Sequence, residues 1–227
     1  PHQTSWGVTT RLIGAVIMTH GDNSGLVLPP AVAPIQVVIV PIAQHKEGVL
    51  DKANEILEKL KASGIRVKLD DSENSPGWKF SEYEMKGVPV RIEIGPRDIE
   101  EGHCIAAVRY SGEKQTVSLE NDFDTLVQKL HALLDKDIPE GMFAKAAENR
   151  ANRTYACTTL DEINKALEKG DGFIKAMWCG EEACEDEVKA KTGVGSRCIP
   201  FEQEHLSDVC VCCGKPAKHM VYWGKAY

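Results

Sequence analysis

The stretch IQVVIVPIAQHKEGVLDKANEILEKLKASGIRVKLDD, residues 35–71, decides how the middle of the chain folds. Residues 35–42 are a continuous apolar run, which is typical of a strand buried on both faces. Residues 48–64 follow the helical period and end at Gly64. The apolar positions on one face of this predicted helix are Leu50, Ala53, Ile56, Leu57 and Leu60. Residues 65–71 predict a second strand, and strands alternating with helices indicate a sheet with helices on its faces.

The same α/β pattern continues to residue 137. Residues 88–95 alternate valine or isoleucine with Arg91 and Glu93, which predicts a half-exposed strand. The runs CIAAVRY and KQTVSLE flank the short turn SGE and predict a β-hairpin. Residues 122–135 place their apolar side chains on one side of a predicted helix.

The first 32 residues predict a strand over TSWGVTT and then a buried helix from Arg11 to about Thr19. Arg11 lies between two glycines and directly precedes an apolar run. A guanidinium keeps its charge, so beside a buried segment it needs an anionic partner. This segment cannot bury itself alone, and we expect it to be the end of a domain whose beginning lies outside this chain.

The last part of the chain differs in character from the middle. It predicts helices near residues 141–152 and 160–170, and strands over GFIKAMW and SRCIPF, with the acidic stretch GEEACEDE between the two strands. The sequence therefore predicts three domains, with boundaries at residues 1–32, 33–137 and 138–227.

Composition excludes some classes of function. The chain has 27 Lys plus Arg against 34 Asp plus Glu, a net charge of −7, which argues against unspecific binding to nucleic acid. Local, shaped recognition of nucleic acid remains compatible with this charge. The apolar run after Arg11 is shorter than the ~20 residues that a membrane span needs, so we expect no membrane association.

Two cysteine pairs with short spacing predict a metal site. Cys179 precedes Cys184 by five positions, and Cys210 precedes Cys213 by three. This pattern favours a closed, structural zinc site with four thiolate ligands, over free buried cysteines or disulfides. Cys212 is an alternative to Cys213 as the fourth ligand. We interpret the remaining cysteines, Cys104, Cys157 and Cys198, as core residues.

The stretch EMKGVPVRIEIGPRD, residues 84–98, gathers acidic and basic residues around the predicted strand. From spacing alone, an ordinary charged sheet edge explains them. The functional alternative is guanine recognition, because arginine bonds guanine O6 and N7 bidentately, and a carboxylate can accept from N1–H and the N2 amino group.

Several stretches together resemble one family. HQTSWGVTTRLIGAVIMTHGD resembles the third signature motif of class II aminoacyl-tRNA synthetases, and SPGWKFSEYEMKGVPVRIEIGPRD resembles the anticodon-binding domain of prolyl-tRNA synthetases. CGEEACEDEVK, SRCIPF, CVCCGKPAK and the terminal GKAY resemble the zinc-binding C-terminal domain of that family, in its archaeal and eukaryotic type. The resemblance spans essentially the whole chain.

The resemblance implies roles for individual residues. Arg11 matches the arginine that grips ATP phosphate, and Thr9 and Gln3 match ATP-binding positions. The positions that line the proline pocket are Ser5, Trp6 and Gly7. Those that contact the two guanines of proline anticodons are Glu84, Arg91, Arg97 and Asp98. The terminal Tyr227 matches a tyrosine that reaches back toward the catalytic site.

The resemblance also implies the activity of the whole protein. A proline–tRNA ligase uses ATP with Mg²⁺ to make prolyl-adenylate and transfers proline to tRNA(Pro), in the cytoplasm and as a homodimer. The first two signature motifs are absent from this chain, so we expect this part alone to be inactive. The fold class implied is the end of an antiparallel catalytic domain, an α/β anticodon-binding domain with a mixed sheet, and a small α+β zinc domain. The alternative is a stand-alone zinc-containing RNA-binding module without catalysis.

Overall fold

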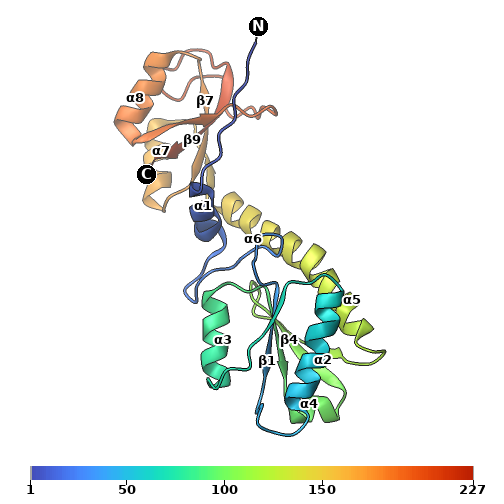
Figure 1. The fold of residues 1–227 in the computed structure, drawn as a ribbon. Coiled ribbons are helices and arrows are strands. Elements are labelled where there is room, and N and C mark those ends of the chain that lie inside the picture. The colour runs from blue at the N-terminus through green and yellow to red at the C-terminus, as the bar shows by residue number, and fades with distance from the viewer. Residues whose placement is uncertain (1, 227) are drawn as a thin grey trace. The chain divides into compact units, whose positions relative to one another are not determined.

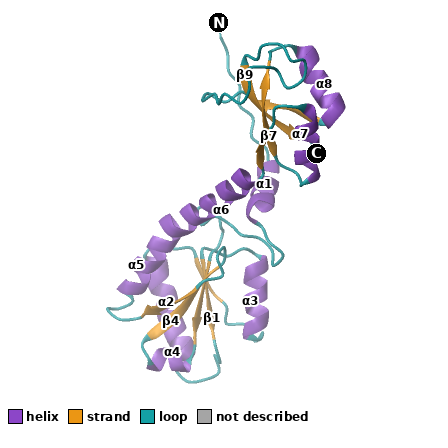
Figure 2. Cartoon of the chain, turned by 180° about the vertical axis from the view of Figure 1, so that it is seen from behind, coloured by secondary structure: helices purple, strands orange, loops and turns teal. Residues whose placement is uncertain are grey.

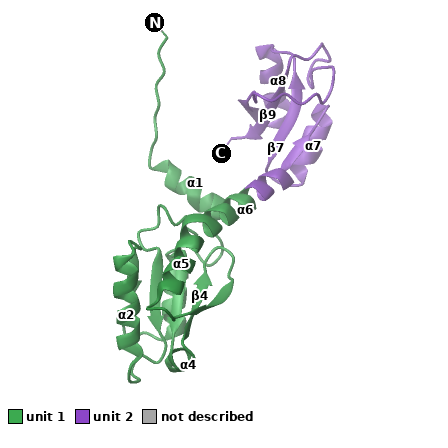
Figure 3. Ribbon diagram, turned by 90° about the vertical axis from the view of Figure 1, so that its right-hand side faces the viewer, with its two compact units in different colours: residues 1–146 green, residues 147–227 purple. Residues whose placement is uncertain are grey.

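The computed structural model describes residues 2–226, which form two compact units (Figure 3). The first unit spans residues 1–146 and the second spans residues 147–227. Tyr227, for which a role was predicted, lies outside the described residues. The division into three domains stays a prediction.

The first unit is built on a five-stranded mixed sheet with the strand order β2-β1-β3-β4-β5. The strands are β1 (Val37–Pro41), β2 (Val67–Leu69), β3 (Val90–Ile94), β4 (His103–Val108) and β5 (Lys114–Ser118). Strand β1 pairs in parallel with β2 and β3, whereas β3–β4 and β4–β5 are antiparallel. The α/β fold with a mixed sheet is therefore confirmed for this part of the chain, and β4–β5 is the predicted hairpin.

Helices cover the two faces of this sheet unequally (Figures 1 and 2). Helices α2 (Val49–Ala62) and α5 (Asp124–Ala132) pack on one face and share a continuous core with the sheet. On the other face, α3 (Pro76–Met85) packs over β1 through Tyr83. Because α3 covers β1 and not the hairpin, the α3 side of β3, β4 and β5 keeps partly exposed side chains.

The short helix α4 (Pro96–Glu100) directly follows β3.

Helix α5 does not end at Ala132. It continues through a π-helical segment (Leu133–Asp137) into α6 (Ile138–Asn152). Pro139 has no N–H to donate in the first turn of α6, which is a typical cause of such an irregularity. The helix predicted from residue 122 begins at Asp124, because Asn121, Asp122 and Phe123 have positive φ.

The second unit contains a four-stranded sheet with the strand order β6-β7-β9-β8. Its strands are β6 (Thr154–Ala156), β7 (Phe173–Trp178), β8 (Val194–Cys198) and β9 (His219–Lys225), and its helices are α7 (Leu160–Glu168) and α8 (Glu182–Thr192). The side chain of Trp223 on β9 is fully buried in the core, together with Ile163 and Val188 of the two helices. No helix among the described residues is long and apolar enough to cross a membrane.

The first segment differs from its prediction. Residues 2–9 form no strand, and helix α1 (Arg11–His20) has no buried side chain, so the prediction of a strand and a buried helix is corrected. A strand needs a neighbour to hydrogen-bond with, and the described residues supply none here. Along α1, Ile13 and Met18 are 63% and 80% exposed.

Two further elements differ from the prediction. The acidic stretch after Cys179, for which no helix was predicted, enters α8 at Glu182, and the buried Cys184 and Val188 lie one turn apart in this helix. Strand β3 was predicted to be half-exposed, but it is the central strand, and Arg91 on it is only 9% exposed. Alternation with charged residues did not indicate exposure of Arg91, because Phe80 and Glu84 of α3 and the neighbouring Glu93 contact its guanidinium.

A buried lysine ties α3 to the sheet. The Lys79 side chain is 2% exposed, and its Nζ donates to the backbone oxygen of Asp70 at 2.8 Å and to Oε1 of Gln44 at 3.1 Å. The Asp70 carboxylate lies 3.7 Å from the same Nζ. The charge is thus compensated where it is buried, at the end of β2.

We expect Lys79→Ala to lower the free energy of unfolding by about 3–5 kcal/mol, because it leaves the Asp70 carboxylate buried without its cation. Lys86→Ala is the matched control, since Lys86 follows the other end of α3, is 49% exposed and pairs with Glu82 on the surface. That change should cost less than about 1 kcal/mol. Urea unfolding measures both values, and equal losses would contradict the assignment.

Candidate functional site

The partly exposed sheet face on the α3 side, which we call the open face, carries side chains from three strands. Arg91 of β3, Ala107 of β4 and Lys114 of β5 lie in one row across the sheet, because Arg91 pairs with Ala107 and Ala107 pairs with Lys114. Side chains two residues apart along a strand share a face. Glu93 therefore lies in the next row of the same face.

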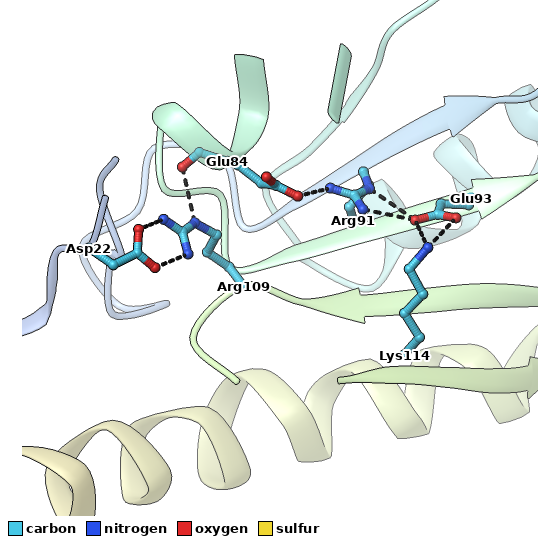
Figure 4. A network of polar contacts seen from close by, with 6 residues as sticks. All are labelled: Asp22, Glu84, Arg91, Glu93, Arg109 and Lys114. Atoms are coloured by element: carbon cyan, nitrogen blue, oxygen red, sulfur yellow. Dashed lines mark hydrogen bonds and ion pairs between the residues drawn. The ribbon is translucent and has the colours of Figure 1, made fainter. Parts of the chain in front are cut away.

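Arg91 is the centre of the polar network on the open face (Figure 4). Its Nη1 donates to Oε1 of Glu84 at 3.0 Å, and its Nε and Nη2 donate to Oε1 of Glu93 at 3.1 and 2.9 Å. The guanidinium carbon lies 3.9 Å from the centre of the Phe80 ring, which gives a cation–π contact. Two carboxylates and one ring thus fix the plane of the guanidinium.

Lys114 extends the network to the edge strand (Figure 4). Its Nζ lies 3.0 and 3.1 Å from the two carboxylate oxygens of Glu93, while its side chain remains 54% exposed. Sequence reasoning missed both Glu93 and Lys114 as site residues. The alternation along β3 could have indicated Glu93, because it shares a face with Arg91, but Lys114 depends on the pairing of distant strands.

A second arginine lies at the other end of the same network. Arg109 donates through Nη1 and Nη2 to the two carboxylate oxygens of Asp22, at 2.7 and 2.6 Å, and through Nε to the backbone oxygen of Glu84 at 3.0 Å. Hydrogen bonds from Arg109 lower the pKa of Asp22 to about 2. Sequence reasoning did not find this pair.

A cavity of about 350 Å³ adjoins these residues, and Glu84, Arg91, Arg109 and Lys114 contribute to its lining. Its wall therefore presents a carboxylate acceptor that is 40% exposed, beside cationic donors. Ligand sites in proteins have volumes from about 300 Å³ upward. The side chains that line the cavity can form hydrogen bonds with a planar group that carries both donors and acceptors on its edges.

The structure places the predicted residues Arg97 and Asp98 apart from this cavity, on α4. Arg97 is exposed. Asp98 accepts from the backbone N–H of Gly95 at 2.7 Å and lies 3.3 Å from Nε2 of His103. The side chain of His103 lies on the open face by the same alternation as Ala107, so Asp98 contacts the far end of that face.

The predicted residues of the first segment do not converge on a site within the described residues. Gln3, Ser5, Trp6, Gly7, Thr9 and Arg11 are all exposed. Trp6 is 92% exposed, and the backbone N–H of Arg11 donates to the Thr9 hydroxyl at 3.3 Å. The predicted anionic partner of Arg11 is absent from the described residues.

The second unit brings four cysteines together. The Sγ atoms of Cys179, Cys184, Cys210 and Cys213 all lie within 4.8 Å of one another. Cys179 follows β7, Cys184 lies in α8, and the other two lie in one turn, which Gly214 closes with a positive φ of 71°. Four converging thiols are the donor set of a tetrahedral metal site, so these residues fit a metal of the zinc type.

The local geometry separates Cys212 from Cys213. Cys213 Sγ lies 3.8 Å from Cys179 Sγ, whereas Cys212 Sγ points to Oε2 of Glu187 at 3.3 Å. Burial opposes ionisation of the Cys210 thiol, but the backbone N–H groups of Cys213, Cys212 and Cys179 lower its pKa to about 7. Burial raises the pKa of the Cys179 and Cys184 thiols, so Cys210 ionises more readily than either of them to the thiolate, the form that binds a metal.

Of the three cysteines interpreted as core residues, Cys104 and Cys157 are buried, but Cys198 is exposed, so that interpretation is corrected for Cys198. Cys198 ends β8, where a register shift between Ser196 and Cys198 interrupts the pairing with β9. The irregular pairing explains why an apolar residue there is not covered.

Two family models match the chain, one within each of the two units. Residues 160–227 match the family model described as "Prolyl-tRNA synthetase, C-terminal", and residues 36–129 match the model described as "Anticodon binding domain". The chain is 61% identical to the proline–tRNA ligase of Ruminiclostridium cellulolyticum, and 59% identical to those of Lachnospira eligens and Clostridium novyi. Each alignment covers 100% of this chain and 46% of the relative.

The chain thus spans less than half the length of the curated relatives that it matches. The matches confirm the resemblance to prolyl-tRNA synthetases. These three relatives come from bacteria, which corrects the attribution to the archaeal and eukaryotic type.

The Asp22–Arg109 pair predicts a pH dependence of stability. The pKa of Asp22 falls from 3.8 to about 2 on folding, so its contribution is fully present above about pH 5 and is lost as pH falls toward 2. The difference in free energy of unfolding between the wild type and Asp22→Asn should therefore shrink between pH 5 and pH 2. Urea unfolding at several pH values measures it, and a difference that stays constant would contradict the pairing.

Proposed function

The chain belongs to the prolyl-tRNA synthetase family, and we propose from this that it is the C-terminal part of a proline–tRNA ligase. In this proposal the whole protein activates proline with ATP and transfers it to tRNA(Pro). This part supplies the ATP-binding third motif, recognition of the anticodon and a structural zinc domain. The stand-alone binding module is not favoured, because the relatives are named as ligases over the whole length of this chain.

The observation that carries the proposal is the pairing of Glu84 with Arg91 beside the cavity on the open face. Guanine carries donors at N1 and N2 and acceptors at O6 and N7, and proline anticodons contain two guanines. The exposed carboxylate of Glu84 can accept from the donor edge. Arg91 and Lys114 carry the positive charge that suits the acceptor edge.

The second guanine of the anticodon would reach the far end of the open face. Asp98 offers a carboxylate oxygen next to His103, and Arg97 is exposed on the same short helix. An unstacked RNA loop can splay neighbouring bases apart, so two sites along one sheet face suit two successive bases. The acidic net charge of the chain agrees with recognition of base edges rather than of phosphates.

The first segment would serve the catalytic reaction. By the resemblance, Arg11 binds ATP phosphate, with Thr9 and Gln3 beside it. Ser5, Trp6 and Gly7 line the proline pocket. Formation of an adenylate depends on positioned cations and Mg²⁺ that stabilise charge on the phosphate. The guanidinium of Arg11 would be one of these cations. A homodimer of the whole protein in the cytoplasm completes the proposal.

The four-cysteine cluster would hold one structural zinc ion. Cys179, Cys184, Cys210 and Cys213 provide four thiolates and leave no open position for water, so the site would contribute to folding and not to catalysis. Its ligands come from the position directly after β7, from α8 and from the turn before β9, and a metal there would join these three segments.

The guanine contact is tested by binding of RNA stem–loops that carry the proline anticodon. Arg91→Lys keeps the charge but cannot form bidentate bonds, so affinity should fall by about 1–3 kcal/mol. The loss should be smaller with a stem–loop in which adenines replace the anticodon guanines. Fluorescence anisotropy measures both affinities.

Lys61→Ala is the control for this test, because Lys61 is 52% exposed on α2, which packs on the opposite face of the sheet. Its affinities should equal those of the wild type. An equal loss of affinity for both RNAs in Arg91→Lys would contradict the guanine contact, because phosphate contact or partial unfolding of the first unit lowers both affinities by the same factor.

The metal ligands are tested by paired serine variants. Cys213→Ser should lose zinc and unfold the second unit, because metal binding there is coupled to folding. Cys212→Ser should keep about one zinc per chain, since its thiol points to Glu187. Elemental analysis and thermal unfolding measure both, and the reverse pattern would move the ligand by one residue.

A further inference from the structure

The proposed anticodon site is built partly on the last turn of α3, which is held from outside by Arg109. The Glu84 backbone oxygen accepts from Gly87 N–H at 3.0 Å and from Arg109 Nε at 3.0 Å. A cation at the C-terminal end of a helix satisfies carbonyl groups that lack partners within the helix. The backbone of Glu84 is therefore fixed independently of its carboxylate.

Arg109 is itself oriented by Asp22. The side chain of Arg109 is only 8% exposed, and both of its Nη atoms donate to the Asp22 carboxylate (Figure 4). With Nε on the Glu84 oxygen, three donors in one plane connect the turn after α1 to the end of α3. A lysine could not make these three contacts at once.

Residues 22–28 also lie against the end of α3 through the backbone. Leu26 N–H donates to the Met85 oxygen at 3.0 Å, and Leu28 N–H donates to the Gly87 oxygen at 3.3 Å. The approach is so close that a Cβ on Gly25 would lie 2.5 Å from Met85 Cα. The Asp22–Arg109 contact is thus one part of a continuous interface.

We propose that Arg109, oriented by Asp22, is a positioning residue that holds Glu84 in the geometry with which it recognises guanine. This inference rests on the proposed function of the open face. In it Arg109 contacts no base and acts only through the position of Glu84. When Arg109 or Asp22 is replaced, the turn that carries Glu84 relaxes, and the carboxylate is no longer aligned with the donor edge of a base.

The experiment compares the affinity of the 227-residue chain for two stem–loops, one with the proline anticodon and one with adenines in place of the anticodon guanines. The readout is the ratio of the two affinities, which we call the discrimination. Partial unfolding lowers both affinities by the same factor, so the discrimination does not report stability. Arg109→Gln and Asp22→Asn should each lower the discrimination about tenfold.

A double-mutant cycle separates positioning from direct contact. Glu84→Ala removes the carboxylate but keeps the backbone oxygen that Arg109 contacts. In this background Arg109→Gln should still lower the melting temperature, yet it should change the discrimination no further. Additive losses of discrimination would overturn the proposal, since Arg109 would then contact the RNA itself.

Arg66→Gln is the matched control. Arg66 also donates to backbone oxygens, those of Ala33 and Pro30 at 3.0 and 2.7 Å, but it does not line the cavity. The Arg66→Gln variant should be less stable than the wild type but should show the same discrimination. If the wild type showed no discrimination, the proposed function would fail. If the wild type discriminated and Arg109→Gln did so equally well, the positioning role alone would fail.

Discussion

The first unit depends on a charged residue in the middle of its central strand. Arg91 lies on β3, which pairs with β1 on one side and β4 on the other, and the residue is 9% exposed. A buried guanidinium must be compensated, and here Glu84 and Glu93 accept its hydrogen bonds while Phe80 covers its face. These partners come from α3 and β3, so the position of the helix and the polarity of the open face follow from one charge.

The open face exists because the two faces of the sheet are unequal. Helices α2 and α5 share a continuous apolar core with one face, whereas α3 covers mainly β1 on the other. The uncovered part of this face carries the charged side chains of Glu93 and Lys114 beside Ala107. A face of this kind cannot stabilise the fold by burial, and its acceptors and donors remain available for a ligand with a polar edge.

The elements that could be predicted from the sequence are those whose signal is local. Residues 48–64 indicate α2 by their period, and the hairpin β4–β5 follows from apolar runs around a short turn. The four cysteines that converge lie in the two short-spaced pairs that the sequence indicates, because the spacing within a pair is local, but the sequence left Cys212 as an alternative to Cys213.

What could not be predicted depends on pairing between distant residues. The burial of Arg91 requires knowledge of which strand is central, and alternation alone suggested exposure. The Asp22–Arg109 contact joins residues 87 positions apart, so no periodicity indicates it. Helix α8 was missed because most of its side chains are charged and exposed, and only Cys184 and Val188 are buried.

The central claim is that the Glu84 carboxylate accepts hydrogen bonds from the donor edge of an anticodon guanine. The most direct measurement uses stem–loops in which inosine replaces one anticodon guanine at a time, because inosine lacks only the N2 amino group. At one of the two positions the wild-type chain should bind the inosine RNA about tenfold more weakly, and Glu84→Ala should bind the guanine and inosine RNAs of that position equally. An undiminished preference for guanine at both positions in that variant would contradict the account.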